Sequence, residues 1–519
     1  MPVAEALAIR DGRIALVGTT DEVRATVGDE TRVVDLEGRT VVPGLVDCHV
    51  HVAGQAAMSH HLDLRDFFTD VPDLPSLLGS LSDRARSAPP GAWVTAQAGP
   101  LQEARMKEGR RPTRHELDRA VPDHPAFVLF GGHITVANSR ALALAGIDRD
   151  TVAPPRGAID FDESGEPTGV LRETAQRLVK DYAPPHGRLD EAVESELRRA
   201  ASRGVTSIHE ITNGPDELAT YQRLEASGDL PVRVQMLIRV IESRFDPDVL
   251  LDLGIADGFG SDLLRIGGIK ISVDGGFTGR NAAFYEPLEW GDEGTAMIRV
   301  EREELTETIR KHHEAGIRAC VHAMGDRAMD MVLDAFDEVL GDEPSAIRHR
   351  VEHLGNWQLD RQRLMRVKSL GLIPVPNPVF LHFLGEVTLN ALGKERAVDA
   401  WPLRSILDAG IPLVFGTDAP AYWPIDPLRD MGTAVTRRTR TGSVIEPGQS
   451  VDPLEALKAI TVNAAEVGGV ADRLGRLVPG MLADIAVLDD DPLQCPTERI
   501  SETQVALTIM NGRVTFENL

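Results

Sequence analysis

The sequence VVPGLVDCHVHV at positions 41–52 joins an apolar run to two histidines, His49 and His51, that are separated by one residue. Residues two apart on a β-strand point to the same face. A strand over these positions would therefore aim both imidazoles in one direction at its carboxyl end, and imidazole nitrogens are good ligands for Zn²⁺. Two structural histidines in a buried strand would give the same pattern, so other parts of the chain must decide between the two interpretations.

The overall composition narrows the class of partner. The chain has 519 residues and a formal net charge of −25, so nucleic acid and anionic membrane surfaces would repel it. Its first residues lack the basic start and apolar core of a signal peptide, and no apolar run is long enough to cross a bilayer. The three cysteines (Cys48, Cys320 and Cys495) form no CxxC pair. We therefore expect a cytoplasmic protein that acts on a small molecule.

Both ends of the chain have hairpin patterns. An Asp-Gly pair at 11–12 and an Asn-Gly pair at 511–512 lie between alternating apolar residues, a strong short-range indication of a tight β-turn. The similarity of the two ends predicts a small β-sandwich domain assembled from residues 1–44 and 468–519.

The middle of the chain alternates strand-like and helix-like segments. Such alternation is typical of the α/β class, and closed into a ring it gives a (β/α)8 TIM barrel, which we assign to residues 45–467. A Pro- and Gly-rich stretch at about 74–168 fits the alternation less well and is interpreted as an insertion over the barrel mouth. The strand candidates are AFVLF, VTSIHE, VRVQMLI, IGGIKISVDG, IRACVHA, RHRVEHL, LIPVPN and IPLVFGTDA, and the helix candidates are LDEAVESELRRAASRG, EELTETIRKHHEAG and residues 329–340.

Polar residues follow or interrupt several of these apolar runs. His322, His353 and Asp418 each come at the end of one, and Lys270 lies inside another. Singly, each has an ordinary structural explanation: a core histidine, a helix-capping aspartate, an ion-paired lysine. Together they fit a metal site, because the carboxyl ends of barrel strands converge on one face and histidine with carboxylate is the ligand set of catalytic zinc. A buried lysine is costly as a cation, so it calls for a partner or a neutralising modification.

The order of these motifs resembles the amidohydrolase superfamily of metal-dependent hydrolases, over nearly the whole chain. The resemblance rests on PGLVDCHVH, the residues above and the closing TVNAAEVGGVADRLGRLVPGMLADIAVLDDDP. More narrowly, the chain is similar to the YtcJ-like branch that includes N-substituted formamide deformylases. The motifs for that branch are GGHITVANSRAL, GEPTGVLRE, KISVDGGFTGRNAAFYEP, VHAMGDRA, RVEHLG and FGTDAP.

The resemblance implies a role for each motif residue. His49 and His51 would bind a first divalent metal, most commonly zinc, with Asp418, while His322 and His353 would hold a second. Lys270 would bridge the two ions as an N6-carboxylated side chain, which removes its charge. One metal or two, and Zn, Fe, Mn or Co, all remain compatible with these ligands. Barrels of this kind also often pair, so a homodimer is expected.

The resemblance further implies a reaction. The metal would lower the pKa of a bound water and polarise a carbonyl. Asp418 would take a proton from that water and pass it to the leaving amine, with Lys270 and His353 supporting the nucleophile. The expected outcome is cleavage of a C–N bond in an amide or N-substituted formamide. A cyclic-amide or lactone hydrolase, a deaminase and a non-catalytic ligand-binding barrel are the alternatives.

Four further residues are candidates for the substrate side of the site. They share positions in glycine-flanked turns or at strand or helix ends: His133, His209, His382 and Asp274. Each has a plain structural alternative, such as stabilising its loop. Adjacent histidines on a helix do not face one ligand, so His312 and His313 are interpreted as helix-surface residues.

Overall fold

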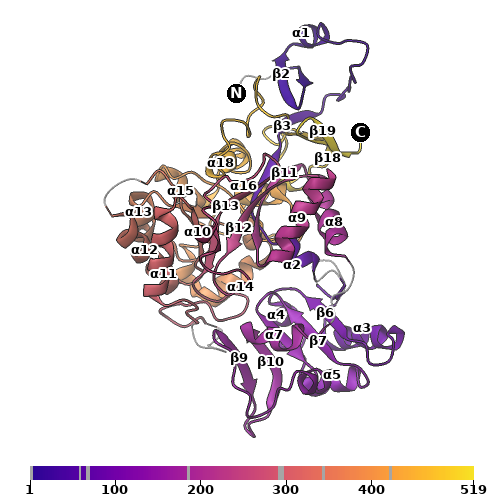
Figure 1. The fold of residues 1–519 in the computed structure, drawn as a ribbon, viewed down its shortest axis with the longest axis vertical. Helices are drawn as coiled ribbons and strands as arrows, with labels where there is room; N and C mark the ends of the chain where they lie inside the picture. The colour runs from indigo at the N-terminus through magenta and orange to yellow at the C-terminus, as the bar shows by residue number, and fades with distance from the viewer. Residues whose placement is uncertain are drawn as a thin grey trace.

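A parallel sheet of seven strands forms the centre of the molecule (Figure 1). The computed structural model describes residues 4–57, 60–65, 71–183, 188–289, 297–341, 345–419 and 423–519. The strands pair in the order β16-β15-β14-β13-β12-β11-β4, every pair parallel. They are β4 (Leu45–Val50), β11 (Val205–Thr212), β12 (Arg233–Arg239), β13 (Leu264–Ser272), β14 (Ala319–His322), β15 (Arg350–Glu352) and β16 (Ile373–Val375).

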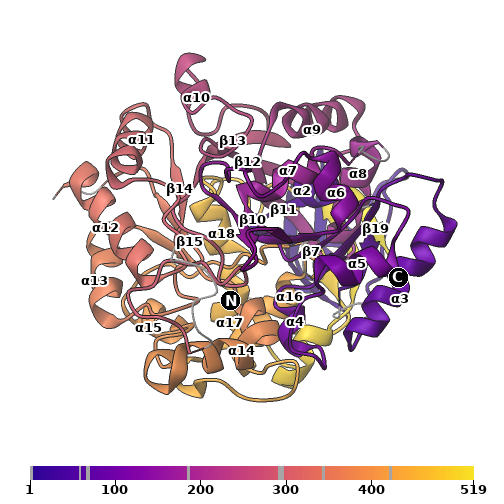
Figure 2. The ribbon, with the colours of Figure 1, turned by 90° about the horizontal axis from the view of Figure 1, so that it is seen from below.

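Helices surround these strands, as the view from below shows (Figure 2). The apolar spacing of α8 is an example of the cause: Val193, Leu197 and Ala200 recur at helical intervals and are buried against the strands. The helices of this part are α2 (Val52–Ala56), α8 (Leu189–Ala201), α9 (Pro215–Ser227), α10 (Val249–Asp252), α11 (Arg302–Glu314), α12 (Asp326–Leu340), α13 (Arg361–Ser369), α14 (Pro378–Ala397), α15 (Leu403–Asp408), α16 (Pro427–Thr436), η2 (Pro447–Gln449), α17 (Pro453–Ala459) and α18 (Val462–Val467).

Residues 411–419, here called the closing segment, occupy the eighth position of the barrel. The predicted strand IPLVFGTDA is wrong as a regular strand, because only Ala419 forms a bridge, with Val50. Backbone hydrogen bonds nevertheless join the segment to β4, from Cys48 N to Phe415 O at 3.0 Å and from Asp418 N to the carbonyl of His49 at 2.8 Å. The barrel is thus nearly closed, and the prediction of a TIM barrel is confirmed.

A second sheet lies below the barrel (Figure 1). Its strand order is β5-β6-β7-β8-β10-β9, with parallel pairing among the first three strands and antiparallel pairing among the rest. The sheet uses residues from 62 to 173, a wider span than the predicted insertion at 74–168, and the division into domains stays a prediction. The elements are β5 (Leu62–Asp63), α3 (Leu74–Ser87), β6 (Val94–Ala98), α4 (Gln102–Arg105), α5 (Arg114–Ala120), β7 (Ala126–Phe130), β8 (Ile134–Ala137), α6 (Ser139–Leu144), β9 (Gly157–Phe161), β10 (Pro167–Glu173), η1 (Thr174–Gln176) and α7 (Arg177–Lys180).

The two ends of the chain meet above the barrel, as predicted. A four-stranded antiparallel sheet places β3 beside three C-terminal strands in the order β19-β18-β17-β3, and the β1-β2 hairpin packs against it through Ile14. No helix in the described part of the chain is long and apolar enough to cross a membrane. The remaining elements are β1 (Ala6–Arg10), β2 (Arg13–Gly18), α1 (Thr20–Arg24), β3 (Thr40–Pro43), β17 (Ile485–Leu488), η3 (Thr497–Glu502), β18 (Val505–Met510) and β19 (Arg513–Glu517).

Candidate metal centre

Three side chains converge where β4 meets the closing segment. One ligand atom each from His49, His51 and Asp418 lies within 4.8 Å of the other two. The Oδ1 atom of Asp418 is 3.1 Å from Nε2 of His51 and 3.4 Å from Nε2 of His49. The side chain of His49 is fully buried, whereas those of His51 and Asp418 are 24% and 14% exposed. The group therefore opens to one side only.

Asp47 on β4 holds β4 and the closing segment together. Its carboxylate accepts hydrogen bonds from the backbone N–H of His49 at 3.1 Å and from the backbone N–H of Thr417 at 3.0 Å, and also from the Thr417 hydroxyl. Asp418 follows with a φ of 57°, a left-handed conformation that non-glycine residues seldom adopt. This sharp turn ends the extended backbone and turns the Asp418 side chain towards the two histidines.

These three residues fit a divalent metal. Nε2 of His49 is buried and has no hydrogen-bond partner among the described residues. A buried polar atom without a partner is costly, and a cation bound there would remove that cost. Burial raises the pKa of Asp418, but the neighbouring imidazoles of His49 and His51 outweigh it and hold the pKa well below its usual range. Two imidazoles and a carboxylate are a ligand set that zinc accepts.

Glu352 orients the His49 ring from below. Its Oε2 is 2.5 Å from Nδ1 of His49, so this nitrogen carries the proton and Nε2 is left as the free ligand atom. Both Glu352 and its partner Arg350 are fully buried, and the guanidinium donates to the two carboxylate oxygens at 2.8 and 2.9 Å. Arg350 also donates to the carbonyl of Cys48 at 2.6 Å. A buried ion pair thus supports the first strand of the centre.

Two further candidate ligands, His353 and His322, lie beside the group. The ring centre of His353 is 4.7 Å from that of His49 and 4.8 Å from that of His322. Nδ1 of His353 bonds to Oδ1 of Asn377 at 2.8 Å, which leaves its Nε2 available. Nε2 of His322 instead lies 3.3 Å from the carbonyl of Gly275.

Lys270 is buried in the middle of β13. Burial lowers the pKa of Lys270 to about 8, although the negative charge of Glu352 acts in the opposite direction. A lysine with such a pKa is neutral more often than usual, and a neutral amine is the form that reacts with CO₂.

The four substrate-side candidates are dispersed. His133 belongs to the second sheet and packs against the loop after β13, with its Nδ1 2.8 Å from Oε1 of Glu173. His209 is buried inside the barrel, where its Nδ1 is 2.7 Å from Arg350. His382 lies on α14 with its Nδ1 3.2 Å from the carbonyl of Arg438.

Asp274, the fourth candidate, anchors loops at the barrel mouth. Its carboxylate accepts three backbone N–H groups, from Ala283, Met324 and Gly325, each at 2.9 Å. Burial raises the pKa of Asp274 to about 7. Its oxygens are therefore already occupied by the protein.

His312 is not a surface residue. It is fully buried on α11, and its Nδ1 donates to the carbonyl of Thr308 at 2.8 Å. The interpretation of it as exposed is therefore wrong. His313 is half-buried, and its Nδ1 is 3.0 Å from Nε2 of His349.

Several residues around the candidate centre are not among those predicted from the sequence. Arg350 and Glu352 alternate within RVEH, so their shared face was a visible signal. Arg239, at the end of β12, and Asn377, just after β16, each follow an apolar run, which is the signal that identified the other candidates.

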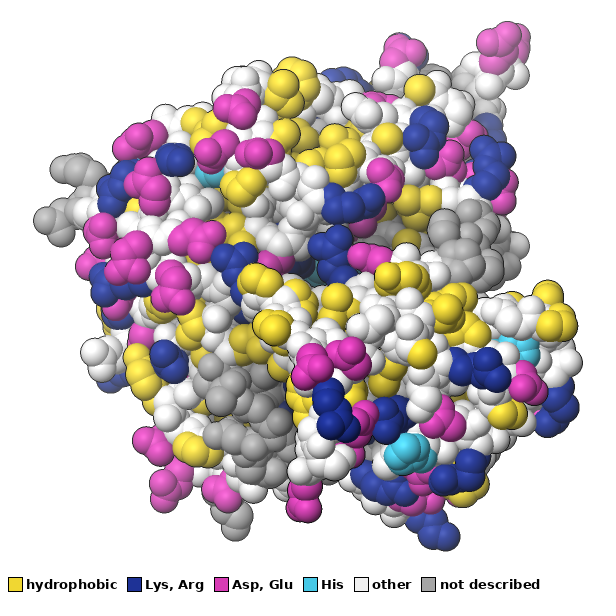
Figure 3. All heavy atoms as spheres, turned by 60° about the horizontal axis from the view of Figure 1, so that its bottom comes forward, with side chains coloured by type: hydrophobic (Ala, Val, Ile, Leu, Met, Phe, Trp, Pro, Cys, Tyr) yellow, Lys and Arg dark blue, Asp and Glu magenta, His cyan; other side chains and the backbone are white. Residues whose placement is uncertain are grey.

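The second sheet contacts the barrel mouth through Glu173. Its Oε1 accepts from Asn281 Nδ2 at 2.7 Å and its Oε2 accepts from Arg299 at 3.2 Å, while Arg299 also pairs with Glu242. In the space-filling view a hollow opens between the second sheet and the barrel, with Lys and Arg side chains at its rim (Figure 3).

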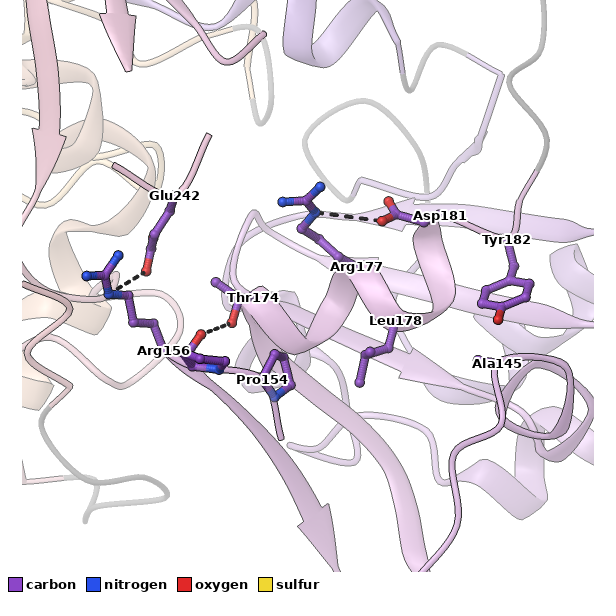
Figure 4. Close-up of a pocket in the computed structure, with 10 residues that line it drawn as sticks. Ala145, Pro154, Arg156, Thr174, Arg177, Leu178, Asp181, Tyr182 and Glu242 are labelled. Carbon is purple, nitrogen blue, oxygen red and sulfur yellow. Dashed lines mark hydrogen bonds and ion pairs between the residues drawn. The ribbon is translucent and has the colours of Figure 1, made fainter. Parts of the chain in front are cut away.

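A separate pocket of about 490 Å³ lies along this seam (Figure 4). Arg156 reaches across it towards Glu242, and Thr174 lines it. It shares no lining residue with the three-residue group at the barrel mouth.

Comparisons with known proteins agree with this arrangement. A family model described as "Amidohydrolase family" matches residues 32–516. The N-substituted formamide deformylase of Arthrobacter pascens is 31% identical over 528 residues, which is 99% of this chain and 95% of the relative. YtcJ of Bacillus subtilis (strain 168), which is named as an amidohydrolase, is 28% identical over 99% of this chain and 96% of its own length.

Among solved structures, an uncharacterized metal-dependent hydrolase from Pyrococcus furiosus superposes with a TM-score of 0.71. It is 28% identical, and the match covers 94% of this chain and 95% of that one.

Proposed function

Because the chain belongs to the amidohydrolase family, we propose that it is a metal-dependent hydrolase that cleaves the C–N bond of an amide or N-substituted formamide. The observation that carries the proposal is the group of His49, His51 and Asp418, with an unpartnered buried nitrogen on His49. Its position at the carboxyl ends of barrel strands is where active sites of this fold form. The printed name of the Arthrobacter relative supports the choice of formamides.

The metal is proposed to be zinc, as one or two ions per chain. His49, His51 and Asp418 would hold one, and His322, His353 and an N6-carboxylated Lys270 would complete a second. When bound, a divalent cation supplies charge that polarises a carbonyl and acidifies water.

The chain's own residues would move the protons. Asp418 is ionised at neutral pH, since its pKa lies well below the usual range, so it can accept a proton from the attacking water. It would then return that proton to the nitrogen of the leaving amine. His353, whose Nδ1 is fixed by Asn377, would present Nε2 to the same water or to a second ion.

Metal content and turnover together test the proposal. We expect one or two equivalents of metal by elemental analysis of protein purified without chelator, and hydrolysis of N-substituted formamides or amides by that protein. Asp418→Asn should lower kcat by about 10³-fold or more, since it removes the general base and one ligand. His49→Ala should reduce bound metal as well as kcat.

His115→Ala is the matched control, because the His115 side chain is 67% exposed and lies on α5, which is not part of the candidate metal centre. Its metal content and kcat should equal those of the wild type. Full activity in either site variant, or no metal after incubation with Zn²⁺ or Mn²⁺, would show that the histidines serve packing alone.

The role of Lys270 is tested separately. Protein equilibrated with ¹³C-bicarbonate should show a carbamate ¹³C resonance that Lys270→Met lacks. The variant should also hold one fewer metal ion. One ion in both proteins and no resonance would exclude the bridging lysine.

A further inference from the structure

Arg239 ends β12 beside the candidate metal centre. It is paired in register with Lys270 on β13, and its Nη1 donates to the hydroxyl of Ser272 at 2.8 Å. Ser272 is in turn paired in register with His322. The guanidinium therefore lies at the level of the candidate ligands, on the strands next to them.

Arg239 is half-buried and has no acidic partner among the described residues. Its Nε is buried without a hydrogen-bond partner, and in the described chain no carboxylate oxygen lies within 4.0 Å of it. Burial lowers the pKa of Arg239 to about 10; the charge of Arg299 adds to this effect, while Glu217 and Asp418 oppose it from a greater distance. The side chain still remains a cation at neutral pH.

Two fully buried arginines of the barrel strands are paired with acids, whereas the buried Arg437, at the end of α16, donates its Nε to the carbonyl of Ile445. Arg233, at the start of the same strand, donates from Nε and Nη2 to both oxygens of Asp484 at 2.8 and 2.9 Å. Arg350 makes the same type of pair with Glu352. Burying a cation is unfavourable unless an anion offsets the lost hydration, so the buried Nε of Arg239, which has no such anion, differs from both pairs.

A metal at the centre would add a further positive charge in the neighbourhood of Arg239, whose charge already interacts with that of Asp418. The fork of Nε and Nη2, which Arg233 uses for Asp484, is unoccupied in Arg239, since only Nη1 is engaged, by Ser272. This fork matches the two oxygens of a carboxylate.

We propose that Arg239 binds a carboxylate of the substrate, so that the substrates are N-formyl or N-acyl amines that carry a carboxylate. This inference rests on the proposed function and names its substrate class. Arg239 would determine specificity, while the reacting amide bond lies at the metal ligands.

Matched pairs of compounds test the inference. The acids N-formylglycine, N-formyl-β-alanine and N-formyl-γ-aminobutyrate are compared with the corresponding neutral carboxamides. The three acids differ in the number of carbon atoms between the formamide and the carboxylate, so they sample three distances between the metal ligands and Arg239. For at least one acid, the wild type should have a higher kcat/KM than for its amide. Arg239→Gln should raise KM for that acid roughly 100-fold and leave the amide unchanged.

Two further variants separate recognition from support of the site. Arg239→Lys keeps the charge but not the fork, so KM for the acid should be intermediate. Arg244→Gln removes a positive charge from an exposed side chain that pairs with Asp216. This variant should leave KM unchanged for both the acid and the amide. Equal loss of kcat for acid and amide in Arg239→Gln, with loss of metal, would overturn the inference and make Arg239 a structural support.

Failure of the proposed function gives a different result. In that case the wild type hydrolyses none of the compounds, and calorimetric titration of the same pairs decides the inference alone. Binding of an acid in preference to its amide, lost in Arg239→Gln, supports the carboxylate site. Equal or absent binding of both overturns it.

Discussion

The tautomer of His49 depends on one buried carboxylate. Glu352 holds Nδ1 of His49 and neutralises Arg350 at the same time. Glu352→Gln should weaken metal binding about 10–100-fold, the usual effect of losing such a support. It should also lower the free energy of unfolding by about 3–5 kcal/mol, since Arg350 would be left unpaired. Chelator competition and urea titration measure the two effects.

Glu466→Gln is the control for Glu352. Glu466 also pairs with an arginine, Arg348, at 2.8 Å, but its side chain is 44% exposed. Exposed pairs contribute less than about 1 kcal/mol, so neither metal affinity nor stability should change measurably. Equal effects of the two substitutions would contradict the role given to Glu352.

The candidate ligands could be predicted because each follows or interrupts an apolar run. His49, His51 and Asp418 are the clearest examples, and the structure brings these three together. Glu352 was missed because its role depends on a contact across 303 positions of sequence. Arg239 was missed for a different reason: its property is a missing partner, which only the folded chain reveals.

The closing segment leaves no space beside His49. A Cβ added to Gly416 would lie 2.5 Å from Cβ of His49. Gly416→Ala should therefore displace the first metal ligand, reduce metal content and destabilise the protein by about 1–3 kcal/mol. Gly79, inside helix α3, has nothing within 4 Å of the added atom, and Gly79→Ala should stabilise the protein by about 0.5–1 kcal/mol. Thermal unfolding and metal analysis compare Gly416→Ala with Gly79→Ala. Similar stability and metal content in the two variants would show that a Cβ at position 416 does not displace His49.

The contact between the second sheet and the barrel is sensitive to acid. Burial raises the pKa of Glu173, but His133, Arg299 and Asn281 lower it by more, and the resulting pKa is about 2. The ionised form thus stabilises the fold above the unfolded value of 4.5, and this contribution disappears as the pH falls from about 4.5 to 2. The free energy of unfolding of the wild type should exceed that of Glu173→Gln by about 3 kcal/mol at pH 7, and this difference should vanish near pH 2. A difference that does not change with pH in denaturant titrations would refute this.

Helices and barrel strands could be predicted more easily than the closure and the second sheet. Helices α8, α11 and α12 have local apolar periodicity, which the sequence displays directly. The closing segment reads as a strand, but within it only Ala419 forms a bridge, to Val50 on β4. The second sheet mixes parallel and antiparallel pairs, a choice made by long-range packing.

The sheet formed by the two ends of the chain is tied to the barrel by a buried ion pair. Arg233 on β12 meets Asp484, just before β17, and both side chains are 4% exposed. Asp484 also accepts the backbone N–H of Asn511 at 2.9 Å. Asp484→Asn should lower the free energy of unfolding by about 3–5 kcal/mol, whereas Asp490→Asn, in a pair whose arginine is 57% exposed, should cost less than about 1 kcal/mol. Urea titration measures the free energy of unfolding of both variants, and equal losses would contradict the role given to the Arg233–Asp484 pair.

The clasp of Asp47 on Thr417 joins positions that are 370 residues apart. A ribosome that adds about 5–20 residues per second needs roughly 20–70 s to make that interval. During this time the nascent chain displays His49 and His51 without Asp418 beside them. The proposed metal site is therefore completed late in biosynthesis. A chain whose translation stops before position 418 lacks the carboxylate ligand of that site.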